Sequence, residues 1–190
     1  MVVATREMAA YCFQVVEYAM CNKMAPPPPD SIPNESSPIF VCFKTVDGDL
    51  RGCIGNFSAQ PLHQQLQRYA AAAAFEDSRF PKLKDKELAA LKCTVSLLHS
   101  YEKITNWQDW TIGVHGISIE YDKGRYRGTF LPSVAREQGW DHKQTLEYLC
   151  RKAKVPVAPT PELFSALVME RYQESAASCA YTEVPLILKL

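Results

Sequence analysis

The chain has 190 residues, of which 47% are hydrophobic and 22% are charged, a composition typical of a folded globular protein. Its 21 basic residues balance its 21 acidic residues, so no net charge favours electrostatic binding to nucleic acid, which we do not expect as a partner. A membrane is not expected either, because no apolar run approaches the roughly 20 residues that span a bilayer, and Arg6 and Glu7 interrupt the region where a signal peptide would be apolar.

The seven cysteines show no metal-binding spacing. They form no C-x-x-C pair and no cluster with histidine, and they stand at positions 12, 21, 42, 53, 93, 150 and 179. We therefore expect no metal and no cofactor. The odd number of cysteines and the lack of a signal peptide favour reduced thiols, which predicts a location in the cytoplasm, or in both the cytoplasm and the nucleus.

The first half of the chain predicts two helices around a β-hairpin. Apolar residues recur at helical spacing after Thr5, prolines 26–29 end that helix, and Asp47-Gly48 is a turn signal between two strands. Ser58 is a candidate helix N-cap, with Pro61 early in the helix. The expected elements are a helix over 5–24, strands over 39–46 and 50–57, and a helix over 61–75.

The second half predicts a further hairpin and several short helices. The expected elements are a helix over 85–91, a strand over 92–100, strands over 117–121 and 125–131, helices over 132–138, 141–150 and 162–167, and a strand over 168–175. The strands of a hairpin pair antiparallel, and the predicted helices lie in segments of the sequence separate from the hairpins. The sequence therefore predicts an α+β fold, in which helices pack on a largely antiparallel sheet, as one compact domain over 1–190 with a cleft.

The stretch from Leu50 to Phe57 carries the densest chemistry in the chain. In a strand, alternation puts Arg51, Cys53 and Gly55 on one face and Ile54 on the core face. The guanidinium of Arg51 would stabilise a thiolate at Cys53, and Gly55, which has no side chain, would leave room for a ligand. The alternative is that Cys53 is a small buried apolar residue and that the glycines only let a helix pack closely.

Two further groups are candidates for a site. The loop from Glu76 to Pro81 joins two carboxylates to Arg79, and either it serves function or a local contact between Asp77 and Arg79 shapes the turn. His115, between two glycines, is the best candidate for a general base, because its ordinary pKa lies near neutrality. A structural histidine with satisfied hydrogen bonds is the alternative.

Five segments together resemble one family, the AMMECR domain. They are Leu50-Arg51-Gly52-Cys53-Ile54-Gly55, Asp77-Ser78-Arg79-Phe80-Pro81, Val95-Ser96-Leu97-Leu98, Gly113-Val114-His115-Gly116-Ile117, and Thr129-Phe130-Leu131-Pro132 running to Asp141. The resemblance covers essentially the whole chain. It implies an α+β fold with a cleft near the Arg-Gly-Cys-Ile-Gly strand, but no established activity. Prokaryotic members occur beside Memo-like and radical-SAM-like proteins, which suggests a role in modifying a macromolecule or metabolite.

Two functions fit these residues. The favoured one is a binding module whose cleft holds a small anionic ligand or a protein partner, and its expected binding residues are Arg51, Gly52, Gly55, Arg79 and Thr129. The alternative is a cysteine-dependent enzyme with Cys53 as nucleophile, His115 as base, and Asp77 or Glu76 as the group that orients them. That reading requires Cys53 and His115 to come within hydrogen-bonding reach.

Overall fold

A computed structural model of the chain describes residues 2–188. Its helices and strands are, in order, α1 (Arg6–Met20), β1 (Ser36–Thr45), β2 (Leu50–Pro61), α2 (Leu62–Phe75), β3 (Leu91–Ile104), β4 (Gly116–Tyr121), β5 (Tyr126–Phe130), α3 (Pro132–Gln138), α4 (His142–Lys152), α5 (Pro161–Ala166), β6 (Val168–Ala180) and α6 (Val184–Ile187). Two short 3-10 helices, Asp85–Ala90 and Tyr181–Glu183, precede β3 and α6.

The strands form one six-stranded sheet in the order β2-β1-β3-β6-β4-β5. The neighbours β1–β2, β1–β3, β4–β5 and β4–β6 pair antiparallel. β2 and β5 are therefore the edge strands of the sheet. The predicted α+β fold with a largely antiparallel sheet and packed helices is confirmed.

By its internal contacts the chain divides into two compact units, one made of residues 1–98 and 175–190 and the other of residues 99–174. Each unit has its own apolar core, and β3 and β6 contribute residues to both units. The single domain over 1–190 stays a prediction. Met1 and residues 189–190 at its ends lie outside the described residues.

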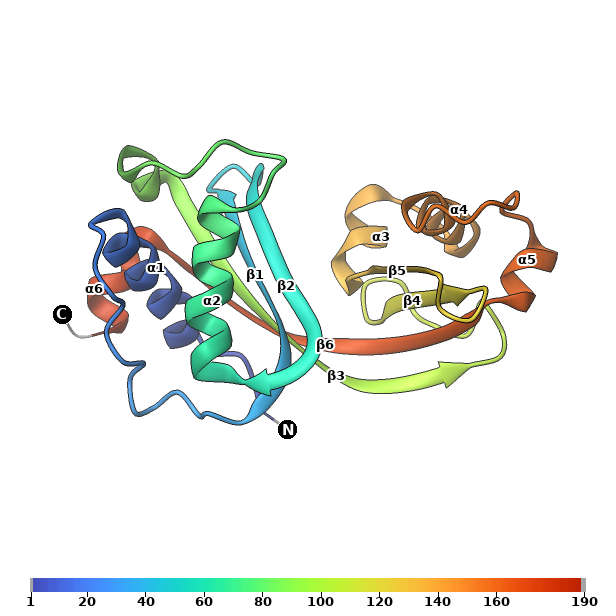
Figure 1. Cartoon of the computed structure of the whole chain (residues 1–190), viewed down its shortest axis with the longest axis horizontal. Helices are drawn as coiled ribbons and strands as arrows, with labels where there is room; N and C mark the ends of the chain where they lie inside the picture. The colour runs from blue at the N-terminus through green and yellow to red at the C-terminus, as the bar shows by residue number, and fades with distance from the viewer. Residues whose placement is uncertain (1, 189–190) are drawn as a thin grey trace. The chain divides into compact units, whose positions relative to one another are not determined.

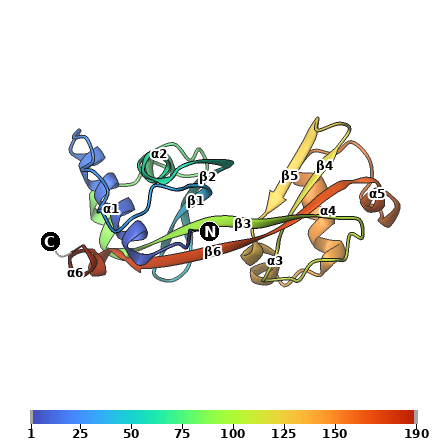
Figure 2. The ribbon, with the colours of Figure 1, turned by 90° about the horizontal axis from the view of Figure 1, so that it is seen from below.

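In the first unit, α1 and α2 cover one face of β1 and β2 (Figures 1 and 2). α1 begins where the Thr5 side chain accepts a hydrogen bond from the N–H of Met8, which satisfies a free amide of the first turn. Phe13 of α1 and Phe43 of β1 are fully buried, with ring centroids 5.4 Å apart. This packing leaves the other face of β1 and β2 to Cys42 and Cys53, which are half-buried.

In the second unit, α4 packs over β5. A Cβ atom built on Gly128 of β5 would lie 3.1 Å from the side chains of Ala153 and Leu149, so the glycine permits this close contact. Asp141 caps α4, because its carboxylate accepts from the N–H of Gln144 while the Gln144 side chain accepts from the N–H of Asp141. Among residues 2–188, no helix combines the length and the apolar character needed to cross a bilayer.

Several predicted boundaries are wrong. Ser58 does not cap a helix, because β2 continues to Pro61 and α2 begins at Leu62. The polar residues Ser36 and Ser37, which precede the predicted strand over 39–46, begin β1 and pair with Pro61 and Gln60. β3 extends to Ile104 and β6 to Ala180, both beyond the predicted ends, and α6 was not predicted. Backbone pairing, rather than apolar pattern, extends these strands.

Candidate functional site

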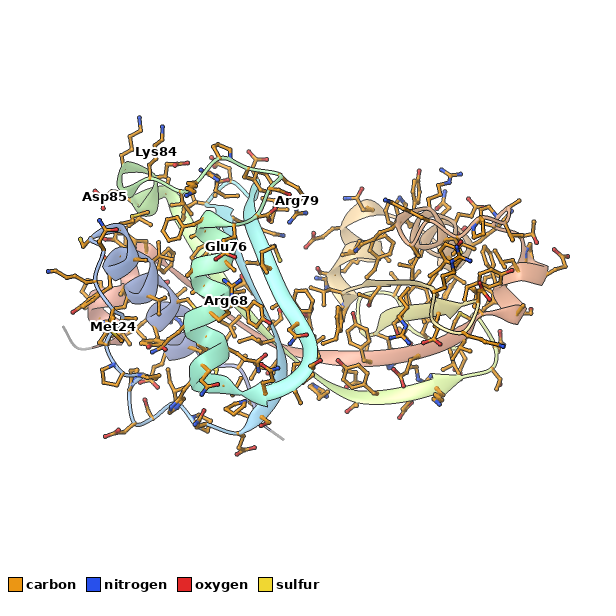
Figure 3. The ribbon with its side chains drawn as sticks, viewed as in Figure 1. Met24, Arg68, Glu76, Arg79, Lys84 and Asp85 are labelled. Atoms are coloured by element: carbon orange, nitrogen blue, oxygen red, sulfur yellow. The ribbon has the colours of Figure 1, made fainter. Side chains whose placement is uncertain are left out.

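The residues around Cys53 come from β2 and from the loop that follows α2. The N–H of Cys53 donates to Oδ2 of Asp77 at 2.9 Å, and Nη2 of Arg79 donates to the carbonyl of Cys53 at 3.3 Å. Arg79 also donates to both carboxylate oxygens of Asp77, at 2.9 and 2.7 Å. The loop thus binds the outer backbone groups of an edge strand and positions a guanidinium beside Cys53. Figure 3 labels Arg79 on the loop that follows α2.

The Asp77–Arg79 pair is buried at one end and open at the other. The Asp77 side chain is 5% exposed, whereas that of Arg79 is 55% exposed. Hydrogen bonds from Arg79 and from the backbone amide of Cys53 lower the pKa of Asp77 to about 2, despite the opposing effect of burial. The local contact predicted as one alternative for this loop is therefore present, and it fixes the cation in one orientation.

Arg51 is held by groups of the segment that precedes β3. Its Nε and Nη2 donate to the carboxylate of Glu87 at 2.8 and 3.2 Å, and Nη1 donates to the carbonyl of Pro81 at 2.8 Å. The cations whose charge lowers the pKa of Cys53 are Arg79 and, to a smaller extent, Lys44. Arg51 ties β2 to the segment before β3, and ligand binding by it stays a prediction.

Cys42 lies directly opposite Cys53 on the neighbouring strand β1. A hydrogen bond from the Cys42 thiol lowers the pKa of Cys53; burial opposes this shift, and the charge of Arg79 adds to it. The same hydrogen bond, together with burial, raises the pKa of Cys42 well above its usual range. Cys53 is therefore the thiol that ionises first, and both cysteines are free and half-buried.

The two glycines of β2 are explained by packing. A Cβ atom on Gly52 would lie 2.0 Å from the carbonyl oxygen of Ala73, so α2 rests directly on this strand. A Cβ atom on Gly55 would lie 2.2 Å from the carbonyl oxygen of Ile39 and 2.5 Å from the Phe40 ring. The place beside Gly55 that we expected to be open is thus occupied by Phe40. The roles of Gly52 and Gly55 in binding a ligand stay predictions.

His115 belongs to the second unit, and both of its ring nitrogens have partners there. Nδ1 accepts a hydrogen bond from the N–H of Thr111 at 2.9 Å, and Nε2 lies 3.4 Å from the side-chain amide of Gln173. Burial and the charge of Arg171 lower the pKa of His115, which favours the neutral ring. These contacts match the structural histidine that was the alternative, and its catalytic role stays a prediction.

Thr129 also binds within the protein. Its hydroxyl donates to the carbonyl of Ile117 at 3.0 Å and lies 2.8 Å from the hydroxyl of Tyr172, which is fully buried. The threonine therefore joins β5 to its neighbour β4 and to β6. Its role in ligand binding remains a prediction.

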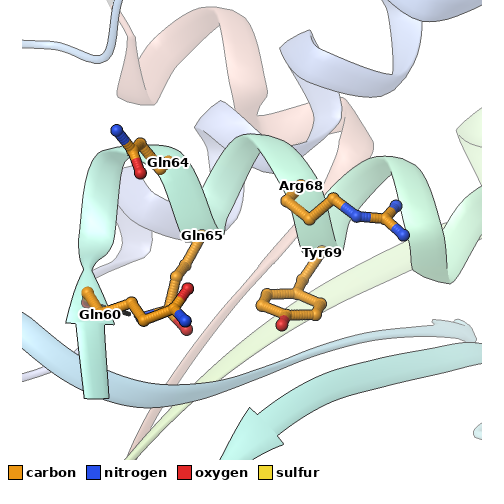
Figure 4. A pocket seen from close by; sticks show the side chains of 5 residues that line it. All are labelled: Gln60, Gln64, Gln65, Arg68 and Tyr69. Atoms are coloured by element: carbon orange, nitrogen blue, oxygen red, sulfur yellow. Dashed lines mark hydrogen bonds between the residues drawn. The ribbon is translucent and has the colours of Figure 1, made fainter. Parts of the chain in front are cut away.

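A cavity of about 200 Å³ lies where β2 meets α2, and it is lined by Gln60, Gln64, Gln65, Arg68 and Tyr69 (Figure 4). Gln65 is 2% exposed and donates through Nε2 to the carbonyls of Ser37 and Gln60, at 2.5 and 2.7 Å. Its Oε1 is buried and has no hydrogen-bond partner among the described residues. Arg68 on the rim is paired with Glu76 at 2.7 and 2.8 Å.

Two features of the site are not evident from the sequence pattern. Cys42 lies within an apolar strand and carries no motif, and the only signal for it is the turn at Asp47-Gly48, which places it on the strand beside Cys53. The glutamines at the start of α2 match no known sequence motif, so nothing in the sequence indicates the cavity that they line. Within residues 2–188, no group of three or more histidine, cysteine or acidic side chains is arranged to hold a metal ion.

Comparison with known proteins gives consistent results. The family model AMMECR1 matches residues 9–177. An uncharacterised protein of Arabidopsis thaliana is 36% identical over 96% of this chain and 88% of its own length, and one of Schizosaccharomyces pombe is 38% identical over 94% of each. The crystal structure of an uncharacterised protein from Pyrococcus horikoshii has the same fold, with a TM-score of 0.75 and 28% identity over 91% of this chain and 89% of that one. The chain therefore belongs to the AMMECR1 family.

Proposed function

We propose that the protein is a binding module, and that the surface formed by Arg79 and Cys53 accepts an anionic group of a small ligand or of a partner protein. The observation that carries this proposal is the state of Arg79. Its guanidinium is held by Asp77 on one side, while 55% of its side chain is exposed. A cation already fixed in one orientation loses little conformational freedom when it binds an anion.

The other arginine of this region is less suited to that role. The side chain of Arg51 is 13% exposed, and its guanidinium is engaged by a carboxylate and two carbonyls. An anion that approached Arg51 would have to displace Glu87, whereas one that approached Arg79 would find an outward guanidinium edge. The half-buried thiol of Cys53 beside it offers a reporter for the surface.

The experiment compares two alkylating agents of the same chemistry and different charge. The full chain is treated with iodoacetamide, which is neutral, and with iodoacetate, which is anionic, and modification is followed by peptide mass spectrometry. The ratio of the iodoacetate rate to the iodoacetamide rate should be higher at Cys53 than at the exposed Cys21. Arg79→Gln should lower the Cys53 ratio toward that of Cys21, and Arg51→Gln should leave it nearly unchanged.

An equal ratio at the two cysteines, or a ratio that Arg79→Gln does not alter, would refute anion recognition at this surface. A Cys53 that resists both reagents in the folded protein would refute it as well, because the surface would then be closed. Urea unfolding of each variant shows whether it has kept the stability of the wild-type fold.

A second function, a cysteine-dependent enzyme, is favoured by the lowered pKa of Cys53. In this reading Cys53 attacks an electrophilic substrate, and Arg79 binds a negative charge of that substrate. Asp77 holds the guanidinium of Arg79 in place. p-Nitrophenyl acetate separates the two readings. Release of a single equivalent of p-nitrophenol indicates a reactive thiol without turnover, whereas sustained release that Cys53→Ser abolishes indicates an enzyme.

A further inference from the structure

The register of the first hairpin brings two thiols to one place. Cys42 of β1 and Cys53 of β2 are directly opposite each other in an antiparallel pair. Because the N–H of Cys53 donates to Asp77, it does not bond to β1, and the two cysteines occupy a non-hydrogen-bonded position of the ladder. At such positions the side chains of facing residues approach each other most closely.

This position meets the geometric needs of a disulfide. Directly opposite Cβ atoms lie about 4.5–5.5 Å apart, and closer at non-hydrogen-bonded positions. A disulfide requires about 3.5–4.5 Å between the same atoms. A small approach of two adjacent strands therefore suffices to join the sulfurs. Both thiols are half-buried, whereas Cys12, Cys93, Cys150 and Cys179 are buried.

From this juxtaposition we propose that Cys42 and Cys53 form a reversible redox pair, which a hydroperoxide oxidises to a cross-strand disulfide. The two thiols have different roles. Cys53 is the first to react, because the hydrogen bond from Cys42 and the charge of Arg79 stabilise its thiolate. Cys42 keeps its proton and resolves the intermediate.

The chemistry balances with a hydroperoxide as the oxidant. The Cys53 thiolate attacks one peroxide oxygen, the O–O bond breaks, and an S–O bond forms, which gives a sulfenic acid and, with hydrogen peroxide, hydroxide. Cys42 then loses its proton and attacks the Cys53 sulfur, the S–O bond breaks, and the oxygen leaves as water. Two thiols lose two electrons, and one hydrogen peroxide becomes two waters. A dithiol reductant reverses the oxidation by thiol–disulfide exchange.

Oxidation also bears on the proposed binding surface, although the redox pair does not depend on it. A disulfide replaces the Cys53 thiol beside Arg79 by a bond directed toward β1. The two proposals are tested separately, since alkylation ratios in the reduced protein report anion recognition and peroxide treatment reports the pair. Either can fail while the other stands.

The test treats the reduced full chain with one equivalent of hydrogen peroxide and then blocks the remaining thiols with an alkylating reagent. Mass spectrometry of the unreduced peptides should show Cys42 joined to Cys53 before either Cys21 or any buried cysteine is modified. In Cys42→Ser the serine hydroxyl can still donate a hydrogen bond, but no sulfur can resolve the intermediate. Dimedone should then trap a sulfenic acid at Cys53, with little trapping in the wild type.

Cys21→Ser is the matched control and should leave the Cys42–Cys53 disulfide unchanged. Oxidation of Cys53 to sulfinic acid in the wild type without a disulfide would overturn the proposal. So would equal dimedone trapping in the wild type and in Cys42→Ser, because Cys42 would then not resolve the intermediate. Thioredoxin with its reductase should restore two free thiols, and a failure to do so would refute reversibility.

Discussion

The carboxylate of Asp77 takes the place of a strand at Cys53. It accepts the outward N–H of Cys53 at 2.9 Å, and Arg79, itself bound to Asp77, donates to the carbonyl of the same residue at 3.3 Å. A neighbouring strand would satisfy these two groups by backbone pairing. Here two side chains of one loop do so and position a cation beside a thiol.

Asp77→Asn should destabilise the protein most at neutral pH. The folded-state pKa of Asp77 is depressed to about 2, so its contribution is fully present above the unfolded-state value of about 4 and is lost as pH falls through 2. Because Arg79 is half exposed, we expect a loss of about 1–2 kcal/mol at pH 7. Urea unfolding from pH 7 to pH 2.5 should show the variant and wild type converging.

Glu76→Gln is the control for this comparison. Glu76 forms a similar pair with Arg68, but both side chains are more than half exposed. Its loss should therefore cost less than about 0.5 kcal/mol. If the two variants lose equal stability, or if the Asp77→Asn deficit does not shrink in acid, the buried carboxylate does not support this edge of the sheet.

The pH dependence of Cys53 alkylation should report its hydrogen bond from Cys42. The hydrogen bond from the Cys42 thiol and the charges of Arg79 and Lys44 lower the pKa of Cys53, burial and the charge of Asp77 raise it, and the net shift is downward. The rate with iodoacetamide should therefore reach half its maximum at a pH below the ordinary pKa of a cysteine thiol. Cys42→Ala removes the donor and should move that midpoint upward, whereas Cys42→Ser should move it less.

A midpoint that Cys42→Ala leaves in place would mean that the hydrogen bond does not determine the acidity of Cys53. A midpoint above the ordinary pKa of a cysteine thiol would mean that burial outweighs the donor and the cation together. Stopped reactions analysed by peptide mass spectrometry give the midpoint for the wild type and for each variant.

Gly52→Ala should be strongly destabilising. The added methyl would lie 2.0 Å from the carbonyl oxygen of Ala73, so α2 would have to move away from β2, and we expect a loss of about 3 kcal/mol or more. Gly139→Ala is the control. Nothing lies within 4 Å of a Cβ atom at Gly139, and only its φ of 67° opposes alanine, at about 1 kcal/mol. Thermal unfolding should rank the two variants in that order, and equal losses would contradict the close contact.

Gln65→Glu should destabilise the segment of β1 and β2 that the Gln65 side chain bridges. The amide of Gln65 donates to the carbonyls of Ser37 and Gln60, and a carboxylate would place negative charge against both oxygens. We expect a loss of about 2–3 kcal/mol, measured by urea unfolding at pH 7. Gln64→Glu, at an exposed position of the same helical turn, should change stability by less than about 0.5 kcal/mol. A similar effect at both positions would argue against the buried amide bridge.

Much of the fold could be predicted from local pattern, but the register of the first hairpin could not. The turn at Asp47-Gly48 indicates the hairpin, yet a register shift between Phe43 and Lys44 adds one residue to β2. With Lys44 opposite Leu50, an unshifted ladder would place Cys42 opposite Gly52. The bulge instead pairs Cys42 with Cys53, and nothing in the sequence marks a bulge of this kind.

The sequence predicts which residues belong to the candidate site better than it predicts which groups they contact. Strand alternation placed Arg51 and Cys53 on one face, but the partner of Arg51 is Glu87, which a sequence pattern cannot connect to it. The loop with Asp77 and Arg79 was recognised because opposite charges two residues apart on a turn can pair locally. The surroundings of His115 could not be predicted in this way, because its contacts with Thr111 and Gln173 depend on tertiary structure.

The charged side chains at the two sheet edges also bear on self-association. On β2 the backbone of Cys53 is bound by Asp77 and Arg79, and on β5 the carbonyl of Thr129 accepts from Nζ of Lys152 at 2.9 Å. A strand from a second molecule would have to displace these ionised groups before it could extend the sheet. Loss of Asp77 would therefore do more than weaken the fold. It would free the backbone groups of Cys53 on an edge strand, and edge-to-edge aggregation should begin there.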